Sequence, residues 1–143
     1  MSICADIKAA RDAGVVRCGL SRGDASLGEL AGEFSLSTDA SCYHEISADA
    51  ARRLAFLILT QDMACNAAIV APALAKSLVD RFFASFGDAD VHFFTNGTFH
   101  EASGERVTYS VATWQPATGA TFDTGVLVVG PVASGALWVE DGN

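Results

Sequence analysis

The chain has 143 residues, enough for one globular domain, and a composition that is 50% hydrophobic and 18% charged excludes an intrinsically disordered protein. The formal net charge is −8. From Phe82 to the C-terminus a single base, Arg106, accompanies seven acids: Asp88, Asp90, Glu101, Glu105, Asp123, Glu140 and Asp141. Such a surface repels phosphate backbones and attracts basic proteins, so nucleic-acid binding is disfavoured. The alternative interpretation is that the acidity serves solubility alone.

Gly and Ser interrupt residues 1–45, where the sequence predicts little beyond a short helix from Ser26 to Phe34. The opening "MSICADIKAARDAG" lacks the basic start and apolar run of a signal peptide, and "LAFLIL" is too short to cross a bilayer. We therefore expect a cytoplasmic protein. The cysteines show no metal-ligand spacing, which indicates reduced, mostly buried thiols and neither a metal nor a cofactor; they are Cys4, Cys18, Cys42 and Cys65.

Two central helices are predicted next. Ser47 can cap a helix that continues to about Asn66 and is apolar nearly all round after Arg53. Pro72 begins a second helix, whose apolar residues recur every three or four positions until Gly87 stops it. The short link between them indicates an antiparallel helical pair.

After Gly87 the pattern becomes typical of strands. Asn96-Gly97 is a strong hairpin signal, which would pair Phe94 with Phe99 and His92 with Glu101. Three further strands are predicted in "RVTYSVATW", "ATFDTGVLVVG" and "GALWVEDG". The fold class is therefore α+β, with an antiparallel sheet in the C-terminal half packed against two central helices in a single domain over residues 1–143.

The search for an active site finds neither Gly-x-Ser-x-Gly nor a phosphate-binding glycine loop. His92 and His100 could form a metal or acid-base pair across the predicted hairpin, but in that register they face opposite sides of the sheet. A local cluster of Cys42, Tyr43, His44 and Glu45 could suggest a thiol nucleophile, but neighbouring residues on a strand point alternately to opposite faces, so this interpretation is disfavoured. The chain is therefore not expected to be an enzyme.

Two acids are candidates for a function. Asp62 lies in a helix that is otherwise too apolar to face water, so it either forms an internal salt bridge or opens into a binding groove. Asp123 either accepts backbone hydrogen bonds in a turn or joins Glu140 and Asp141 in an acidic recognition surface.

The order of "LTQD", "FFTNG", "W-x-P-A-T-x-A-T-F-D-T-G-V" and "LWVEDG" resembles small bacterial immunity proteins of polymorphic or contact-dependent growth-inhibition toxin systems. The resemblance covers Ile46 to Gly142. It implies a non-catalytic inhibitor that binds a basic toxin domain, such as a nuclease, and blocks its working surface. The residues that the resemblance suggests for toxin binding are Asp62, Thr95, Asn96, Trp114, Asp123, Trp138, Glu140 and Asp141.

Two other functions remain open at this point. One is an enzyme for a small molecule that uses Asp62 or Asp123 together with His92 or His100. The other is a homodimeric adaptor subunit that associates through an edge strand of its sheet.

Overall fold

The computed structural model describes residues 2–65, 67–101 and 109–142, with the backbone alone at 98–101 and 109–114. The N-terminal part contains α1 (Ile3–Ala10), β1 (Val15–Arg22), α2 (Leu27–Glu33), a short 3-10 helix η1 (Ala40–Cys42) and β2 (His44–Ile46). Two longer helices follow, α3 (Ala48–Thr60) and α4 (Pro72–Ala84). The remaining strands are β3 (His92–Thr95), β4 (Gly97–Glu101), β5 (Tyr109–Trp114), β6 (Phe122–Val129) and β7 (Ala133–Asp141).

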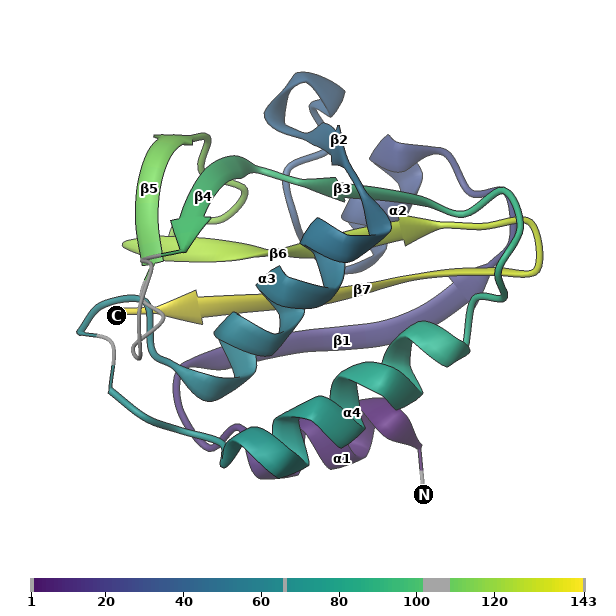
Figure 1. The fold of residues 1–143 in the computed structure, drawn as a ribbon. Coiled ribbons are helices and arrows are strands. Elements are labelled where there is room, and N and C mark those ends of the chain that lie inside the picture. Colours follow the sequence, from purple (N-terminus) through teal and green to yellow (C-terminus); the bar gives the residue numbers. More distant parts are fainter. Residues whose placement is uncertain (1, 66, 102–108, 143) are drawn as a thin grey trace.

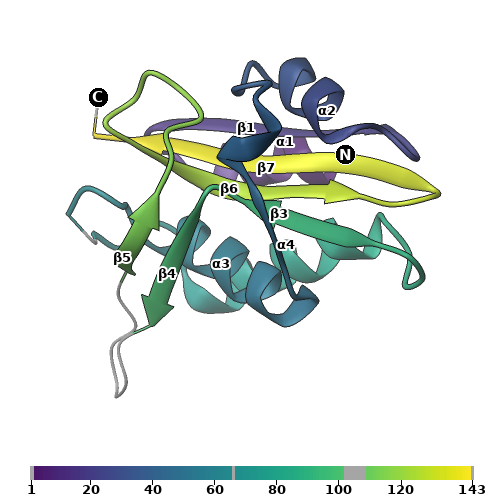
Figure 2. The same ribbon diagram turned by 90° about the horizontal axis from the view of Figure 1, so that it is seen from above.

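A five-stranded antiparallel sheet with the order β1-β7-β6-β3-β2 organises the described chain (Figure 1). Helices α3 and α4 cover one face, and α2 covers the other (Figure 2). Strands β4 and β5 form a separate two-stranded sheet. The α+β class is confirmed, although the sheet extends beyond the C-terminal half, because β1 and β2 supply both of its edges.

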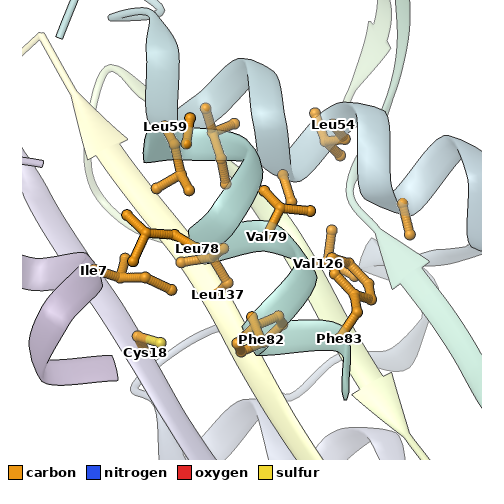
Figure 3. Close-up of a cluster of buried hydrophobic side chains, with 14 of the residues drawn as sticks. Ile7, Cys18, Leu54, Leu59, Leu78, Val79, Phe82, Phe83, Val126 and Leu137 are labelled. Atoms are coloured by element: carbon orange, nitrogen blue, oxygen red, sulfur yellow. The ribbon is translucent and has the colours of Figure 1, made fainter. Parts of the chain in front are cut away.

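The central strands are apolar on both faces because each face is covered. Val126 and Val128 of β6 point toward α3 and α4, whereas Leu127 between them points toward α2. In β7, Leu137 likewise points toward α3 and α4, whereas Trp138 points toward α2. Successive side chains of a strand point to opposite faces of the sheet, so they form two separate cores: a larger one under α1, α3 and α4 (Figure 3) and a smaller one under α2.

The predicted helix starts are confirmed. Ser26 caps α2 and Ser47 caps α3 with their hydroxyls, and Pro72 is the first residue of α4. The predicted end of the first long helix is wrong. Helix α3 stops at Thr60, and Gln61 forms an isolated antiparallel bridge with Ala68.

The predicted hairpin at Asn96-Gly97 is also wrong. A tight type I′ turn requires positive φ at both residues, and neither residue has it. Strand β3 instead pairs with β2 and β6, so that Phe94 lies opposite Glu45 and Leu127, while β4 leaves the main sheet and pairs with β5. The chain bends here because Asn96 is held inside the protein by its side chain, as described below.

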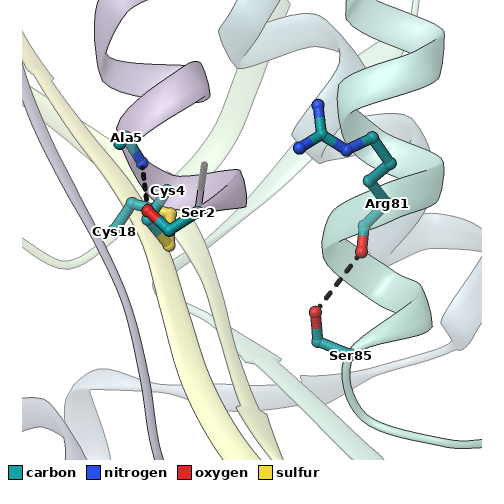
Figure 4. Close-up of a disulfide and its surroundings, with 6 residues drawn as sticks. All are labelled: Ser2, Cys4, Ala5, Cys18, Arg81 and Ser85. Carbon is teal, nitrogen blue, oxygen red and sulfur yellow. Dashed lines mark hydrogen bonds between the residues drawn. A yellow bond between two sulfur atoms is a disulfide. The ribbon is translucent and has the colours of Figure 1, made fainter.

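The prediction that all four cysteines are reduced is wrong for two of them. Cys4 of α1 and Cys18 of β1 form a disulfide, with Cα atoms 5.3 Å apart (Figure 4). Cys42 and Cys65 are free thiols, buried and exposed respectively. Sequence spacing offered no signal, because only the packing of α1 against β1 brings the first two cysteines together.

The disulfide should stabilise the fold by restricting the unfolded chain. It joins residues 14 positions apart, and closing a loop of that size contributes about 3 kcal/mol. We expect a reductant to lower the free energy of unfolding, measured in urea, by about this amount. A Cys4→Ser/Cys18→Ser variant should lose the response to reductant, whereas Cys65→Ser should keep it. A wild-type midpoint that is unchanged by reductant would contradict the prediction.

Candidate functional site

Asp123 lies inside the protein, with no exposed surface. Its Oδ1 accepts hydrogen bonds from Asn96 Nδ2 (2.9 Å), the Ala117 backbone N–H (3.1 Å) and Trp138 Nε1 (3.1 Å). Its Oδ2 accepts from the backbone N–H and the hydroxyl of Thr118, at 3.2 and 3.0 Å. The carboxylate therefore fastens the segment before β6 onto β6 and β7. The interpretation as a residue that closes a turn fits this geometry, and the recognition role does not.

Asn96 belongs to the same buried network. Its Nδ2 also donates to the Gln115 carbonyl (2.8 Å) and its Oδ1 accepts from the Thr124 hydroxyl (2.9 Å), which lies 3.3 Å from the hydroxyl of Thr95. Thr95 and Asn96 are each 1% exposed. Trp138 is fully buried and packs edge-on against Tyr43, with ring centroids 5.8 Å apart. Three more of the residues suggested by the resemblance thus lie in the interior of the fold.

The two C-terminal acids form ion pairs within the chain. Asp141 is 2% exposed and binds Arg11 through both oxygens, at 3.0 and 2.8 Å, and it also accepts from the Met63 backbone N–H. Glu140 binds Arg17 of β1 at 3.0 Å. These pairs tie α1, β1 and the segment after α3 to the end of β7. The predicted acidic recognition surface at the C-terminal strands does not form.

Asp62 lies just beyond α3 rather than within it. Its carboxylate accepts from the Ala64 backbone N–H at 2.6 Å and lies 3.3 Å from the Cys65 sulfur. It shapes the turn that follows α3, whereas the sequence predicts either an internal salt bridge or a place in a binding groove. The last candidate, Trp114, ends β5, and its side chain lies outside the described part of the structure.

The enzyme interpretation gains no support from the described residues. His92 is exposed at the start of β3, where its Nδ1 lies 2.8 Å from Glu45. The Cys42 thiol is buried and donates to the Pro116 carbonyl, and burial, followed by the charges of Asp123 and Asp39, raises its pKa, so it stays protonated at neutral pH. In the part of the chain that is described, no three His, Cys, Asp or Glu residues gather as a metal site. The side chain of His100 lies outside that part.

A different group of acids is exposed together, on the side of the sheet that α2 covers. Between Arg22 and Arg52 the sequence contains six acids and neither Lys nor Arg. We call four of these residues the acidic face; they are Asp24, Glu29, Glu33 and Asp39. Glu29 and Glu33 are one helical turn apart. Hydrogen bonds from the hydroxyl and the backbone of Ser41 lower the pKa of Asp39, which is therefore ionised at neutral pH.

Three of the four acids, Glu29, Glu33 and Asp39, are held near one another by α2 and the loop after it, and Asp24 precedes the helix. A Cβ added at Gly28 or Gly32 of α2 would lie about 3 Å from Thr38, so the residue before Asp39 rests against the helix. Of the four acids, Glu29 is ion-paired, to Arg22 at 2.7 Å. The sequence signal for the acidic face is the long interval without a base between Arg22 and Arg52, which the prediction of a C-terminal acidic surface missed.

A second feature lies on the opposite side of the sheet. A pocket of about 330 Å³ opens between α3 and α4, and the residues around it are Asp49, Arg52, Arg53, Phe56, Leu57, Lys76, Val79 and Asp80. A hydrogen bond from Lys76, supported by the charges of Lys76 and Arg52, lowers the pKa of Asp80. The lining therefore carries ionised groups of both signs around an apolar floor.

Comparison with protein-family models, with curated proteins and with solved structures finds no match. Among the described helices, none combines the length and the apolar character that a bilayer span requires.

Proposed function

We propose that this protein is an immunity protein that binds and neutralises a basic toxin domain, and that the acidic face is its contact surface. The observation that carries the proposal is the excess of exposed acids around α2, where Arg22 pairs with Glu29 and three further acids are exposed. The acidic face lies on the α2 side of the sheet. Among the described residues, five of the six exposed bases lie on α1, α3 and α4, near the other face; they are Lys8, Arg52, Arg53, Lys76 and Arg81.

The mechanism follows from charge complementarity. A toxin that acts on nucleic acid must be basic where it grips phosphates. An acidic face steers such a surface toward itself, raises the association rate and then occupies the site that phosphates would use. The chain itself performs no chemical step in this proposal. Because exposed charges are screened within about 8 Å at physiological ionic strength, association should slow as salt is added.

The proposal places the protein in the cytoplasm, where an incoming toxin would act. Disulfides are rare in cytosolic proteins, so the Cys4–Cys18 bridge counts against this location. Mass spectrometry of the protein isolated from cells under acid quench distinguishes the reduced from the disulfide-bonded form, because the disulfide-bonded form lacks two hydrogens.

Charge reversal on the acidic face tests the proposal. We expect Glu33→Lys/Asp39→Lys to weaken binding of a basic toxin captured from the native bacterium by about tenfold or more, since each close charge pair at an interface couples by about 1.5 kcal/mol or more. Both side chains are exposed, so the melting temperature should change little. Titration at two salt concentrations is the measurement.

The matched control is Asp12→Lys/Asp88→Lys, which changes the net charge equally at exposed positions outside the acidic face. It should bind with nearly wild-type affinity at physiological salt. If both double variants weaken binding equally, only net charge matters and the acidic face is not the contact surface. If no basic partner is retained even at low salt, the immunity function itself is wrong.

A second candidate function, the homodimeric adaptor, is favoured by one observation. Strand β1 forms an edge of the sheet and exposes two apolar side chains, Val15 at 42% and Leu20 at 49%. An exposed edge with apolar side chains is suited to pairing with a second copy. A sedimentation mass that rises with concentration would favour this function over the inhibitor.

A further inference from the structure

The α3–α4 pocket is built from two regular stripes of side chains. Asp49, Arg52, Arg53 and Phe56 recur along α3 at intervals of three and four residues, and Lys76, Val79 and Asp80 do the same along α4. Such intervals place side chains on one face of a helix. Since α3 and α4 pack against each other, the two stripes become the walls of one groove.

The floor of this pocket is apolar and firmly held. Leu57 and Val79 are 3% and 4% exposed, and Phe56 is half-buried beside them. The volume of about 330 Å³ lies at the lower end of the range for small-molecule sites, about 300–1,000 Å³. A ligand of one or two fused rings therefore fits the available space.

The charges at the rim favour an anion. Three bases and two acids line the pocket, so its formal charge is +1 in a chain of −8. Asp80 forms ion pairs with two cations: one of its carboxylate oxygens lies 3.3 Å from Arg52 and the other 2.8 Å from Lys76. Asp49 lies in the first turn of α3, where the helix dipole favours a negative charge.

Arg52 is held at the pocket by two neighbours. Its guanidinium lies over the Phe83 ring, 5.1 Å from the centroid, and donates to Asp80 through one nitrogen. A guanidinium has five N–H donors in a planar fork that matches a carboxylate or sulfonate. The remaining donors of Arg52 and of Lys76 are therefore available beside the apolar floor.

We propose that the α3–α4 pocket binds a small organic anion whose flat apolar body rests on Phe56, Leu57 and Val79 while Arg52 and Lys76 hold its acidic group. This site lies on the opposite side of the sheet from the acidic face and does not rest on the proposed function.

The probe is anilinonaphthalene sulfonate, a fluorescent anion with a flat naphthalene ring, and its neutral counterpart is phenylnaphthylamine. The sulfonate should bind the full-length protein saturably and shift the backbone amide resonances of α3 and α4. The Arg52→Gln/Lys76→Gln variant should raise the Kd of the sulfonate about tenfold, because it loses hydrogen bonds to a charged group. The neutral dye should bind more weakly than the sulfonate to the wild type and equally to both proteins.

The control variant is Lys8→Gln/Arg22→Gln, which removes the same charge from exposed positions that do not line the pocket. It should change the Kd by less than about twofold, since distant exposed charges are screened. The inference fails if both variants weaken binding equally, if the neutral dye binds as tightly as the sulfonate, if the resonance shifts lie outside α3 and α4, or if no saturable binding occurs. Melting temperatures of both variants check that the fold is intact.

Discussion

Asp141→Asn is expected to lower the free energy of unfolding by about 3–5 kcal/mol. The physical reason is the buried partner that the carboxylate leaves behind. The side chain of Arg11 is fully buried, and Asp141 binds it through two hydrogen bonds. An asparagine has almost the same size but no charge, so the guanidinium would remain inside the protein without a counter-ion. Urea denaturation, followed by circular dichroism, measures the change.

The structural consequences of this ion pair extend beyond two residues. Arg11 also donates to the carbonyls of Ala13, Ile58 and Gln61, so one side chain joins the end of α1 to the end of α3. We expect the loss to reach the whole cooperative unit, because it releases α1, α3 and β7 from one another at the same point.

Two comparisons make the Asp141 prediction specific. Asp80→Asn removes a carboxylate from an exposed ion pair and should cost less than about 1 kcal/mol. An Arg11→Met/Asp141→Leu variant removes both buried charges and should be less destabilised than the sum of its single substitutions. A cost for Asp141→Asn as small as that for Asp80→Asn would show that the pair does not hold the fold together.

Asp123→Ala should be at least as damaging, with a loss of about 4 kcal/mol or more. The substitution removes the acceptor of several buried donors, among them Asn96 Nδ2, Trp138 Nε1 and the backbone N–H of Ala117. Each buried donor left without an acceptor costs about 1–3 kcal/mol. Because these donors belong to different segments, the loop before β6 should detach from the sheet. Urea denaturation again gives the magnitude.

Graded variants separate the contributions within this network. Trp138→Phe keeps an aromatic side chain but loses the Nε1 donor and part of the buried ring volume, so it should cost about 1–3 kcal/mol. Asp123→Asn keeps the size, yet it turns amide N–H groups toward donors that need an acceptor, so it should resemble Asp123→Ala. The recognition hypothesis makes the opposite prediction, namely loss of toxin binding with an unchanged melting temperature. A stable Asp123→Ala protein would therefore restore that hypothesis.

Local patterns in the sequence were sufficient for the α+β class and for the central elements. Ser47 and Pro72 mark helix starts by backbone chemistry that needs no distant partner, and the three- and four-residue spacing that follows indicates one buried helical side. The apolar runs of β6 and β7 are long enough to indicate buried strands. The short helix predicted from Ser26 to Phe34 is confirmed as α2, and its first turn is capped by Ser26.

The tertiary structure alone decided the edges of the sheet and the role of the acids. Strand β1 is stabilised by its pairing with β7, which lies more than 100 residues away in the chain. The local sequence of β1 does not predict this pairing. Asn96-Gly97 has the composition of a hairpin turn, but the buried contacts of the Asn96 amide outweigh that local preference. The same holds for Asp123 and Asp141, whose burial depends on donors brought from other segments. The sequence identifies each charged side chain. Its partners, and therefore its function, depend on which distant segments pack around it.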